Sequence, residues 1–99
     1  MGARENRVER LLKDEVLKLG GNSYKWVGLA GVPDQIVIVQ GHTWFVEVKT
    51  VDGAVSPVQQ RRHRDLISVG AKVRVVYGDA GVHEFIKEVK HVIKTPATA

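Results

Sequence analysis

The chain is 99 residues long, which is the size of one domain, and we expect a single domain over residues 1–99. It contains no cysteine, which excludes disulfide bonds, thiolate zinc sites and cysteine nucleophiles, and no apolar run reaches the roughly 18 residues that a membrane span needs. The formal net charge of +4 and the pI near 9.6 suit a polyanionic partner such as nucleic acid, although a soluble basic domain without such a partner has the same composition.

The first predicted element is an amphipathic helix that ends at Gly20 and Gly21. Its apolar residues recur at three- and four-residue steps and are Val8, Leu11, Leu12, Val16 and Leu19. Glu5 lies three residues before Val8 and therefore shares the buried-side stripe of this helix. A loop or short strand is expected over residues 22–33.

A β-hairpin follows, with strands over residues 35–40 and 43–49 and a two-residue turn at Gly41 and His42. Ser56 and Pro57 begin a second helix that ends at Gly70, and residues 72–77 form the next strand. Because this helix is long enough for a crossover, we expect the strands on either side of it to be parallel. A final helix is indicated by the helical spacing of apolar residues between 82 and 93. The pattern predicts an α/β fold with a small mixed sheet flanked by helices.

Three charged residues are predicted to share one face of the hairpin. With a turn at Gly41 and His42, Asp34 pairs with Lys49, and Glu47 points to the same side. Two carboxylates on a half-buried sheet face are costly unless they are compensated, and a divalent cation such as Mg²⁺ or Mn²⁺ supplies that compensation. The alternative for Glu47 and Lys49 alone is an exposed ion pair on a strand edge.

These residues carry a family resemblance. Pro33-Asp34, thirteen residues before Glu47-Val48-Lys49, resembles the PD-(D/E)xK nuclease signature. The wider pattern resembles the VRR-NUC family in order and spacing, from about Arg4 to Tyr77. Its further pieces are Gly20-Gly21, Tyr24-Lys25, Gly31-Val32, Gly53, Ser56-Pro57-Val58-Gln59 and the segment from Leu66 to Gly70. The resemblance implies a restriction-endonuclease-like core.

It also implies roles for individual residues. Asp34 and Glu47 correspond to metal ligands, with the Val48 backbone carbonyl completing the protein side of the site. Lys49 corresponds to the catalytic lysine. The remaining matches are Gln59 as a glutamine that reaches back into the site, Glu5 as a further metal or water contact, and Lys25 as a basic residue near the site.

Several of these residues have a structural alternative. Gln59 also completes a capping box with Ser56, and the two roles are expected to exclude each other because one amide has to serve both. Glu5 could be a solvated acid favoured by the dipole of the first helical turn. In addition to Lys25, five basic residues are expected to bind nucleic-acid phosphates, namely Arg61, Arg62, Arg64, Lys72 and Arg74. The alternative is that these residues only form a solvated surface. His63 as a general base is unnecessary if a metal and Lys49 activate water.

The leading hypothesis is a divalent-metal-dependent endonuclease that hydrolyses DNA. So small a domain has little surface for reading a base sequence, so we expect selection of branched or four-way junction DNA by shape and a homodimer that cuts two strands. Stand-alone VRR-NUC members of this size resemble virus-encoded enzymes, which predicts a cytoplasmic location, in the host cell if the protein is viral. The alternatives are a non-catalytic DNA-binding module and a metal-dependent RNA phosphodiesterase.

Overall fold

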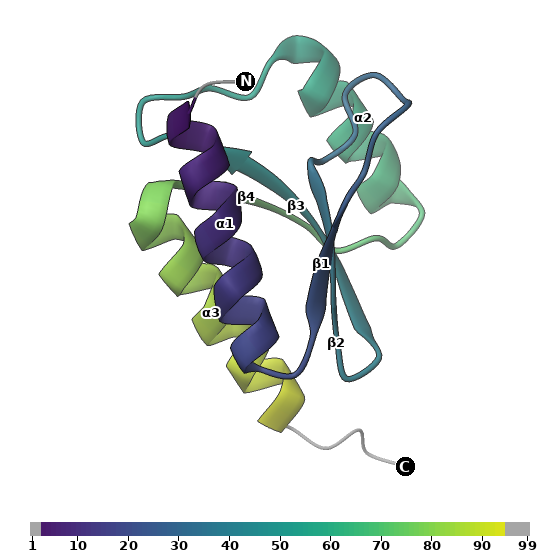
Figure 1. The fold of residues 1–99 in the computed structure, drawn as a ribbon. Coiled ribbons are helices and arrows are strands. Elements are labelled where there is room, and N and C mark those ends of the chain that lie inside the picture. Colours follow the sequence, from purple (N-terminus) through teal and green to yellow (C-terminus); the bar gives the residue numbers. More distant parts are fainter. Residues whose placement is uncertain (1–2, 95–99) are drawn as a thin grey trace.

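The computed structural model describes residues 3–94, which form a three-layer α/β fold (Figure 1). In chain order the elements are α1 (Ala3–Lys18), β1 (Asn22–Lys25), β2 (Gln35–Val39), β3 (His42–Lys49), α2 (Pro57–Ser68), β4 (Val73–Tyr77) and α3 (Gly78–Lys94). The strands form one sheet in the order β1-β2-β3-β4, antiparallel except for the parallel pair β3 and β4. The predicted mixed sheet and the parallel crossover through α2 are therefore confirmed.

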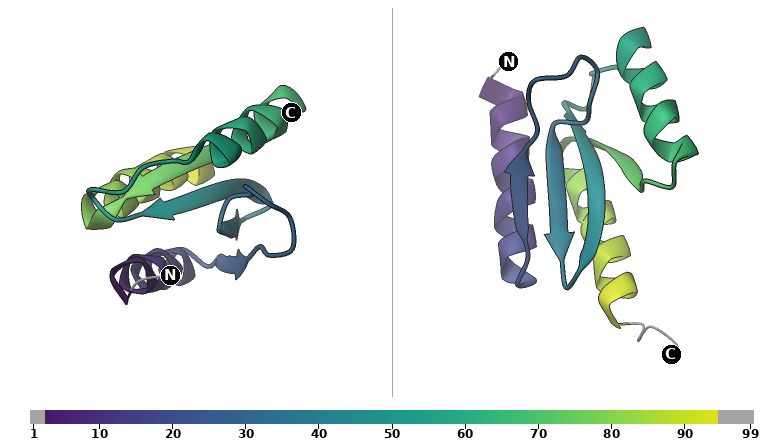
Figure 2. Two further views of the ribbon diagram at one scale, coloured as in Figure 1. Left: turned by 90° about the horizontal axis from the view of Figure 1, so that it is seen from above. Right: turned by 90° about the vertical axis from the view of Figure 1, so that its right-hand side faces the viewer.

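The two faces of the sheet are covered unequally. Helices α1 and α3 lie side by side on one face, and α2 lies on the other, near the carboxyl ends of β3 and β4 (Figures 1 and 2). The main core lies under α1 and α3, where the predicted stripe of α1 is buried at Val8, Leu12 and Val16. Trp44 of β3 packs edge-on against Phe85 of α3, with ring centroids 5.8 Å apart. The face of the sheet under α2 lies outside this main core.

The hairpin turn lies one residue earlier than predicted. Val39 pairs with His42, so the turn residues are Gln40 and Gly41, both with positive φ (50° and 82°). This is the conformation of a type I′ turn, which accepts glycine readily at its second position and would strain His42 there. The pairing register therefore differs from the predicted one by two residues. A shift by two keeps every side chain on its expected face, because side chains alternate with period two.

Gly31, in the loop before Asp34, packs closely against the first turn of α2. Its φ is +79°, and a Cβ built there would lie 2.6 Å from the Val58 carbonyl oxygen. Gly28, with φ +102° and no atom within 4 Å of its Cβ position, is a matched control that has the backbone strain alone. We expect Gly31→Ala to lower the free energy of unfolding by about 2–3 kcal/mol and Gly28→Ala by about 1 kcal/mol, measured by urea denaturation. Equal losses in the two variants would contradict the close packing.

No helix within residues 3–94 is long and apolar enough to cross a membrane.

Candidate active site

The predicted charged trio comes together on the sheet face that α2 covers. Asp34 lies just before β2, and its Oδ2 accepts a hydrogen bond of 2.9 Å from the backbone N–H of Val48. Because of the shifted register, Asp34 lies beside Glu47 rather than Lys49. The Lys49 Nζ is 3.9 Å from Glu47 Oε2, and the two side chains are only 14% and 1% exposed. Two carboxyl groups and one ammonium therefore share a nearly buried site.

Burial leaves Glu47 short of compensating positive charge. Its pKa is raised from the ordinary 4.5 to about 8, first because the carboxyl group is desolvated and second because it hydrogen-bonds and lies next to the carboxyl group of Asp34. Lys49 opposes this increase without cancelling it. A divalent cation between the two carboxylates would supply the missing charge, and carboxylate oxygens are the ligands that Mg²⁺ and Mn²⁺ prefer. The donor set therefore fits such an ion.

Helix α2 closes the site through Gln59. The Gln59 Nε2 donates to Glu47 Oε2 at 3.2 Å, while its Oε1 accepts from the Ser56 backbone N–H at 2.9 Å. The Ser56 Oγ in turn accepts from the Gln59 backbone N–H at 3.2 Å, which completes the capping box. The expectation that the two roles exclude each other is wrong, because the amide uses its oxygen for the cap and its nitrogen for the site.

The two roles of Gln59 can be separated by substitution. Ser56→Ala removes the cap acceptor and leaves the contact to Glu47, so we expect a loss of about 1 kcal/mol in unfolding free energy and little change in cleavage rate. Gln59→Glu keeps an acceptor for the Ser56 N–H but replaces the donor to Glu47 by a third carboxylate. We expect it to reduce cleavage by at least tenfold, about 1.4 kcal/mol. A cleavage rate that follows stability in both variants would show that Gln59 acts only as a cap.

His63, which the sequence analysis set aside as an unnecessary general base, contacts the site. Its Nε2 lies 3.3 Å from Glu47 Oε1, and the residue is only 7% exposed. Desolvation lowers the pKa of its imidazole below the ordinary value, so the ring is neutral near pH 7. The available signal was its spacing of four residues from Gln59, which places both side chains on one face of a helix. His63 is therefore a buried neutral partner of Glu47 and contacts Oε1, the carboxyl oxygen that Gln59 does not bind.

Helix α1 brings two acidic residues to the edge of the site. Glu5 is half-buried, and its charge acts on both Glu47 and Glu9. Glu9, one turn further on, lies near Asp34, and its Oε2 is 3.7 Å from the Nζ of Lys25. The Glu9 Oε1 is buried without a hydrogen-bond partner among residues 3–94, and desolvation raises the pKa of this carboxyl group. The charge of Glu5 thus acts on Glu47 and that of Asp34 acts on Glu9, so both α1 acids lie near the carboxylate pair.

Within residues 3–94, no three or more His, Asp or Glu side chains are arranged as a ready-made metal cage. A cation at this site would therefore be held by the pair Asp34 and Glu47, and Mg²⁺ commonly uses only one or two carboxylates, with water and substrate phosphate as its other ligands. The orphaned Glu9 oxygen and the raised pKa of Glu47 both indicate a site that lacks a positive charge.

The predicted phosphate-binding residues divide into two groups. Arg61 and Arg64 are exposed on α2, and Arg62 donates to the Ala30 carbonyl oxygen at 3.2 Å. Lys72 and Arg74 lie on the opposite side of the sheet from Glu47, because Arg74 pairs with Val46 of the core face.

Both of these residues are also engaged within the protein. Arg74 binds Glu88 through Nε and Nη2 at 2.8 and 2.7 Å, and the Lys72 Nζ lies 4.1 Å from the ring centroid of Trp44. The structure therefore places Lys72 and Arg74 on the far face of the sheet from the carboxylates, since the strand alternation turns them toward α3, and their binding of nucleic acid stays a prediction.

Comparisons with known proteins found similarity in both sequence and structure. The chain is 41% identical over 76 residues to "Putative nuclease p44" of Acyrthosiphon pisum secondary endosymbiont phage 1, which covers 74% of this chain and 82% of the phage protein. A solved structure described as a VRR_NUC domain is 34% identical, with a TM-score of 0.78 over 87% of this chain and 97% of that chain. The chain belongs to the VRR-NUC nuclease family. No family model matches the chain.

Membership of the VRR-NUC family confirms the resemblance read from the Pro33-Asp34 and Glu47-Val48-Lys49 motifs and the fold expected from it. In this VRR-NUC chain the first motif lies directly before β2 and the second at the end of β3, the antiparallel neighbour of β2. Helix α2, inserted between β3 and β4, supplies Gln59 and His63 above them. The VRR-NUC fold thus brings together side chains from three segments that are separated in the sequence.

Proposed function

We propose that this protein is a divalent-metal-dependent endonuclease that hydrolyses DNA phosphodiester bonds at the site formed by Asp34, Glu47 and Lys49. The observation that carries the proposal is the buried Glu47 carboxyl group, 1% exposed, next to Asp34 and only partly compensated by Lys49. A purely structural site would replace such a pair by apolar residues at little cost. A hydrolytic site needs it, because the carboxylates bind an ion that also contacts the phosphate.

Each residue has a distinct role in this proposal. Asp34 and Glu47 hold Mg²⁺, or Mn²⁺ as a substitute, and the Val48 carbonyl completes the protein ligands. When bound, the ion polarises the phosphoryl group and lowers the pKa of a coordinated water. The Lys49 ammonium, held beside Glu47, orients the attacking water and stabilises the negative charge that develops on the phosphate oxygens. Glu5 and Glu9 adjust the charge at the α1 edge of the site.

Gln59 is a positioning residue in the proposed enzyme. Its amide donates to Glu47 Oε2 while its oxygen is held by the Ser56 N–H. The Glu47 carboxylate is thereby fixed in orientation by the first turn of α2, and Lys49 holds the same oxygen from the other side. Fixing a ligand through a second hydrogen-bonded residue commonly accounts for 10- to 100-fold in metal affinity or activity.

The DNA substrate is proposed to be branched, with four-way junctions preferred, and the active form to be a homodimer. The site lies on a domain of 99 residues that has little further surface for reading bases, so shape is the more accessible signal. A two-fold symmetric dimer presents two sites that match the two strands of a symmetric junction. Exposed Arg61 and Arg64 on α2 and Lys25 on β1 flank the site and suit contacts to phosphates. A cytoplasmic location is part of the same proposal.

The test uses the purified protein with supercoiled plasmid, a labelled linear duplex, a labelled four-way junction and a labelled single-stranded RNA. We expect cutting of DNA with Mg²⁺ or Mn²⁺, no cutting with EDTA, and symmetric paired cuts in the junction. DNA binding without cutting in any metal would leave a binding module instead. Cutting of RNA alone would assign the site to a metal-dependent RNA phosphodiesterase.

A further inference from the structure

A groove of about 300 Å³ lies between α1 and the β1–β2 edge of the sheet, next to the proposed catalytic site. It is lined by Asn6, Glu9, Arg10 and Lys13 of α1 and by Ser23, Lys25 and Gln35 of the strands. Glu9 connects the groove to the site, because its carboxyl group interacts with Asp34. Gln35 follows Asp34 directly in the chain. The groove therefore lies next to the proposed catalytic carboxylates.

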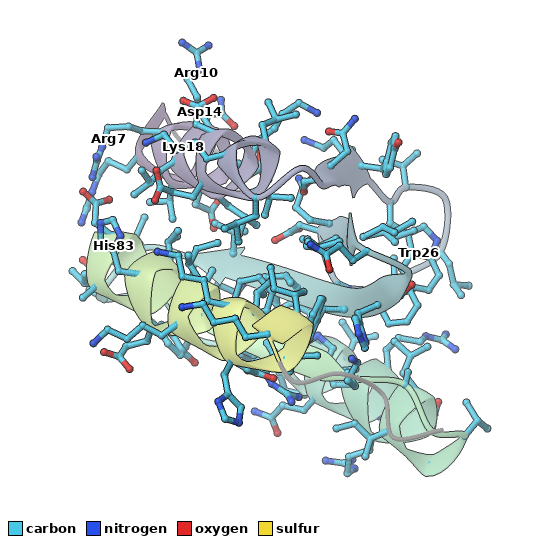
Figure 3. All side chains as sticks on the ribbon, turned by 90° about the horizontal axis from the view of Figure 1, so that it is seen from below. Arg7, Arg10, Asp14, Lys18, Trp26 and His83 are labelled. Atoms are coloured by element: carbon cyan, nitrogen blue, oxygen red, sulfur yellow. The ribbon has the colours of Figure 1, made fainter. Side chains whose placement is uncertain are left out.

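The walls of the groove carry more positive than negative charge. Three cations line it, namely Arg10, Lys13 and Lys25, against one acid, Glu9, which pairs with Lys25 at 3.7 Å. Arg10 is exposed and has no ion-pair partner among residues 3–94, and its side chain points away from α1 into solvent (Figure 3). By contrast, the other groove beside α1 pairs each of its arginines with an aspartate, Arg4 with Asp52 and Arg7 with Asp79.

The floor of the groove is polar and already organised. Ser23 and Gln35 are 3% and 8% exposed, and the Ser23 Oγ donates to Gln35 Oε1 at 3.1 Å. The Lys13 Nζ donates to the Ser23 carbonyl oxygen at 2.9 Å and to Asn22 Oδ1 at 3.0 Å. An ammonium has three N–H donors, so one remains for a ligand. A hydrated, anionic group suits this floor better than an apolar one.

We infer that this groove binds a backbone phosphate of the DNA strand that flanks the scissile phosphate, with Arg10 and the remaining donor of Lys13 as its contacts. The inference rests on the proposed function and deepens it, because it assigns a direction in which the bound strand leaves the site, along α1. Such contacts position the nucleic acid without reading its sequence and make binding dependent on salt. Arg10 is a binding residue here and takes no part in the chemical step.

Steady-state cleavage of the DNA substrate with Mg²⁺ at several salt concentrations tests the inference. The variants are Arg10→Ala, Arg10→Glu and Arg10→Lys, with Lys87→Glu as a control of equal charge change on α3. We expect Arg10→Ala to raise KM by about 3- to 10-fold with kcat nearly unchanged. The slope of log(kcat/KM) against log[salt] should become less steep by about 1, the share of one phosphate contact. Arg10→Glu should raise KM further, and Arg10→Lys should restore most of the loss.

The outcomes distinguish a failure of the groove inference from a failure of the proposed nuclease function. If the wild-type protein cuts DNA but the Arg10 variants keep its KM and salt slope, the groove is not a phosphate site and the proposed function stands. The same conclusion follows if Lys87→Glu raises KM as much as Arg10→Glu, since the effect would then come from net charge. If the wild-type protein cuts no DNA with any metal, the proposed function fails, and the groove assignment fails with it.

Discussion

Replacing Lys49 with alanine is expected to reduce DNA cleavage by about 100- to 1,000-fold while the protein stays folded. The ammonium lies 3.9 Å from Glu47 Oε2 and is largely shielded from solvent, so its interaction with a developing anionic charge is strong. Its loss also removes a cation that keeps the pKa of Glu47 from rising further. The variant should therefore stabilise the transition state less, and its Glu47 carboxyl group should keep its proton to a higher pH.

Two further variants make this prediction specific. Lys49→Arg keeps the charge but not the compact ammonium, so we expect cleavage to recover only in part. Lys72→Ala removes a lysine from the opposite face, where it lies over the ring of Trp44, and should leave cleavage unchanged while costing about 0.5–1 kcal/mol of stability. Plasmid nicking rates and urea denaturation of each variant provide the measurements. A Lys49→Ala protein that retains more than a tenth of the wild-type rate would contradict the catalytic role.

The composition of the sheet face could be predicted although the hairpin register could not. Turn position depends on which residues accept positive φ, and the sequence around Gly41 allows more than one solution. The shift amounts to two residues, so Asp34, Glu47 and Lys49 remain on one face whichever turn forms. The consequence that did change is local: Asp34 lies beside Glu47, which strengthens their mutual repulsion and raises the pKa of Glu47.

The rest of the site depends on tertiary packing that local patterns do not encode. Helical spacing places Gln59 and His63 on one face of α2, but only the docking of that helix brings both to Glu47. The approach of Glu5 and Glu9 to the carboxylates likewise depends on how α1 docks beside the sheet. For the basic residues, alternation along β4 correctly puts Lys72 and Arg74 on one face, while the face itself follows from pairing with β3.

Glu47→Gln is expected to abolish cleavage and, in the absence of metal, to make the protein more stable. Glutamine has nearly the same shape, so it can keep a contact with Gln59, but it cannot ionise and is a poor ligand for Mg²⁺. In the wild-type protein the folded-state pKa of Glu47, about 8, lies above the ordinary 4.5. The stability that the protonated carboxyl group contributes is therefore fully present below pH 4.5 and is lost as the pH rises through about 8.

The variant lacks this pH dependence, so its stability advantage over the wild-type protein should grow by about 4 kcal/mol from pH 5 to pH 9. His63 contacts Glu47, so its titration also differs between the two proteins, but its lowered pKa places that titration below the pKa of Glu47. The change in stability between pH 7 and pH 9 is therefore the part of the difference that reports Glu47. Mg²⁺ binds the ionised carboxylates of the folded wild-type protein and should recover its stability at pH 9, but should have little effect on Glu47→Gln. Urea denaturation of both proteins, in EDTA and in Mg²⁺, at pH 5, pH 7 and pH 9 measures the unfolding free energies that are compared. If the wild-type protein and the variant have equal stability at pH 9 in EDTA, the Glu47 carboxylate is already compensated within the fold, and the main support for a metal at this site is lost.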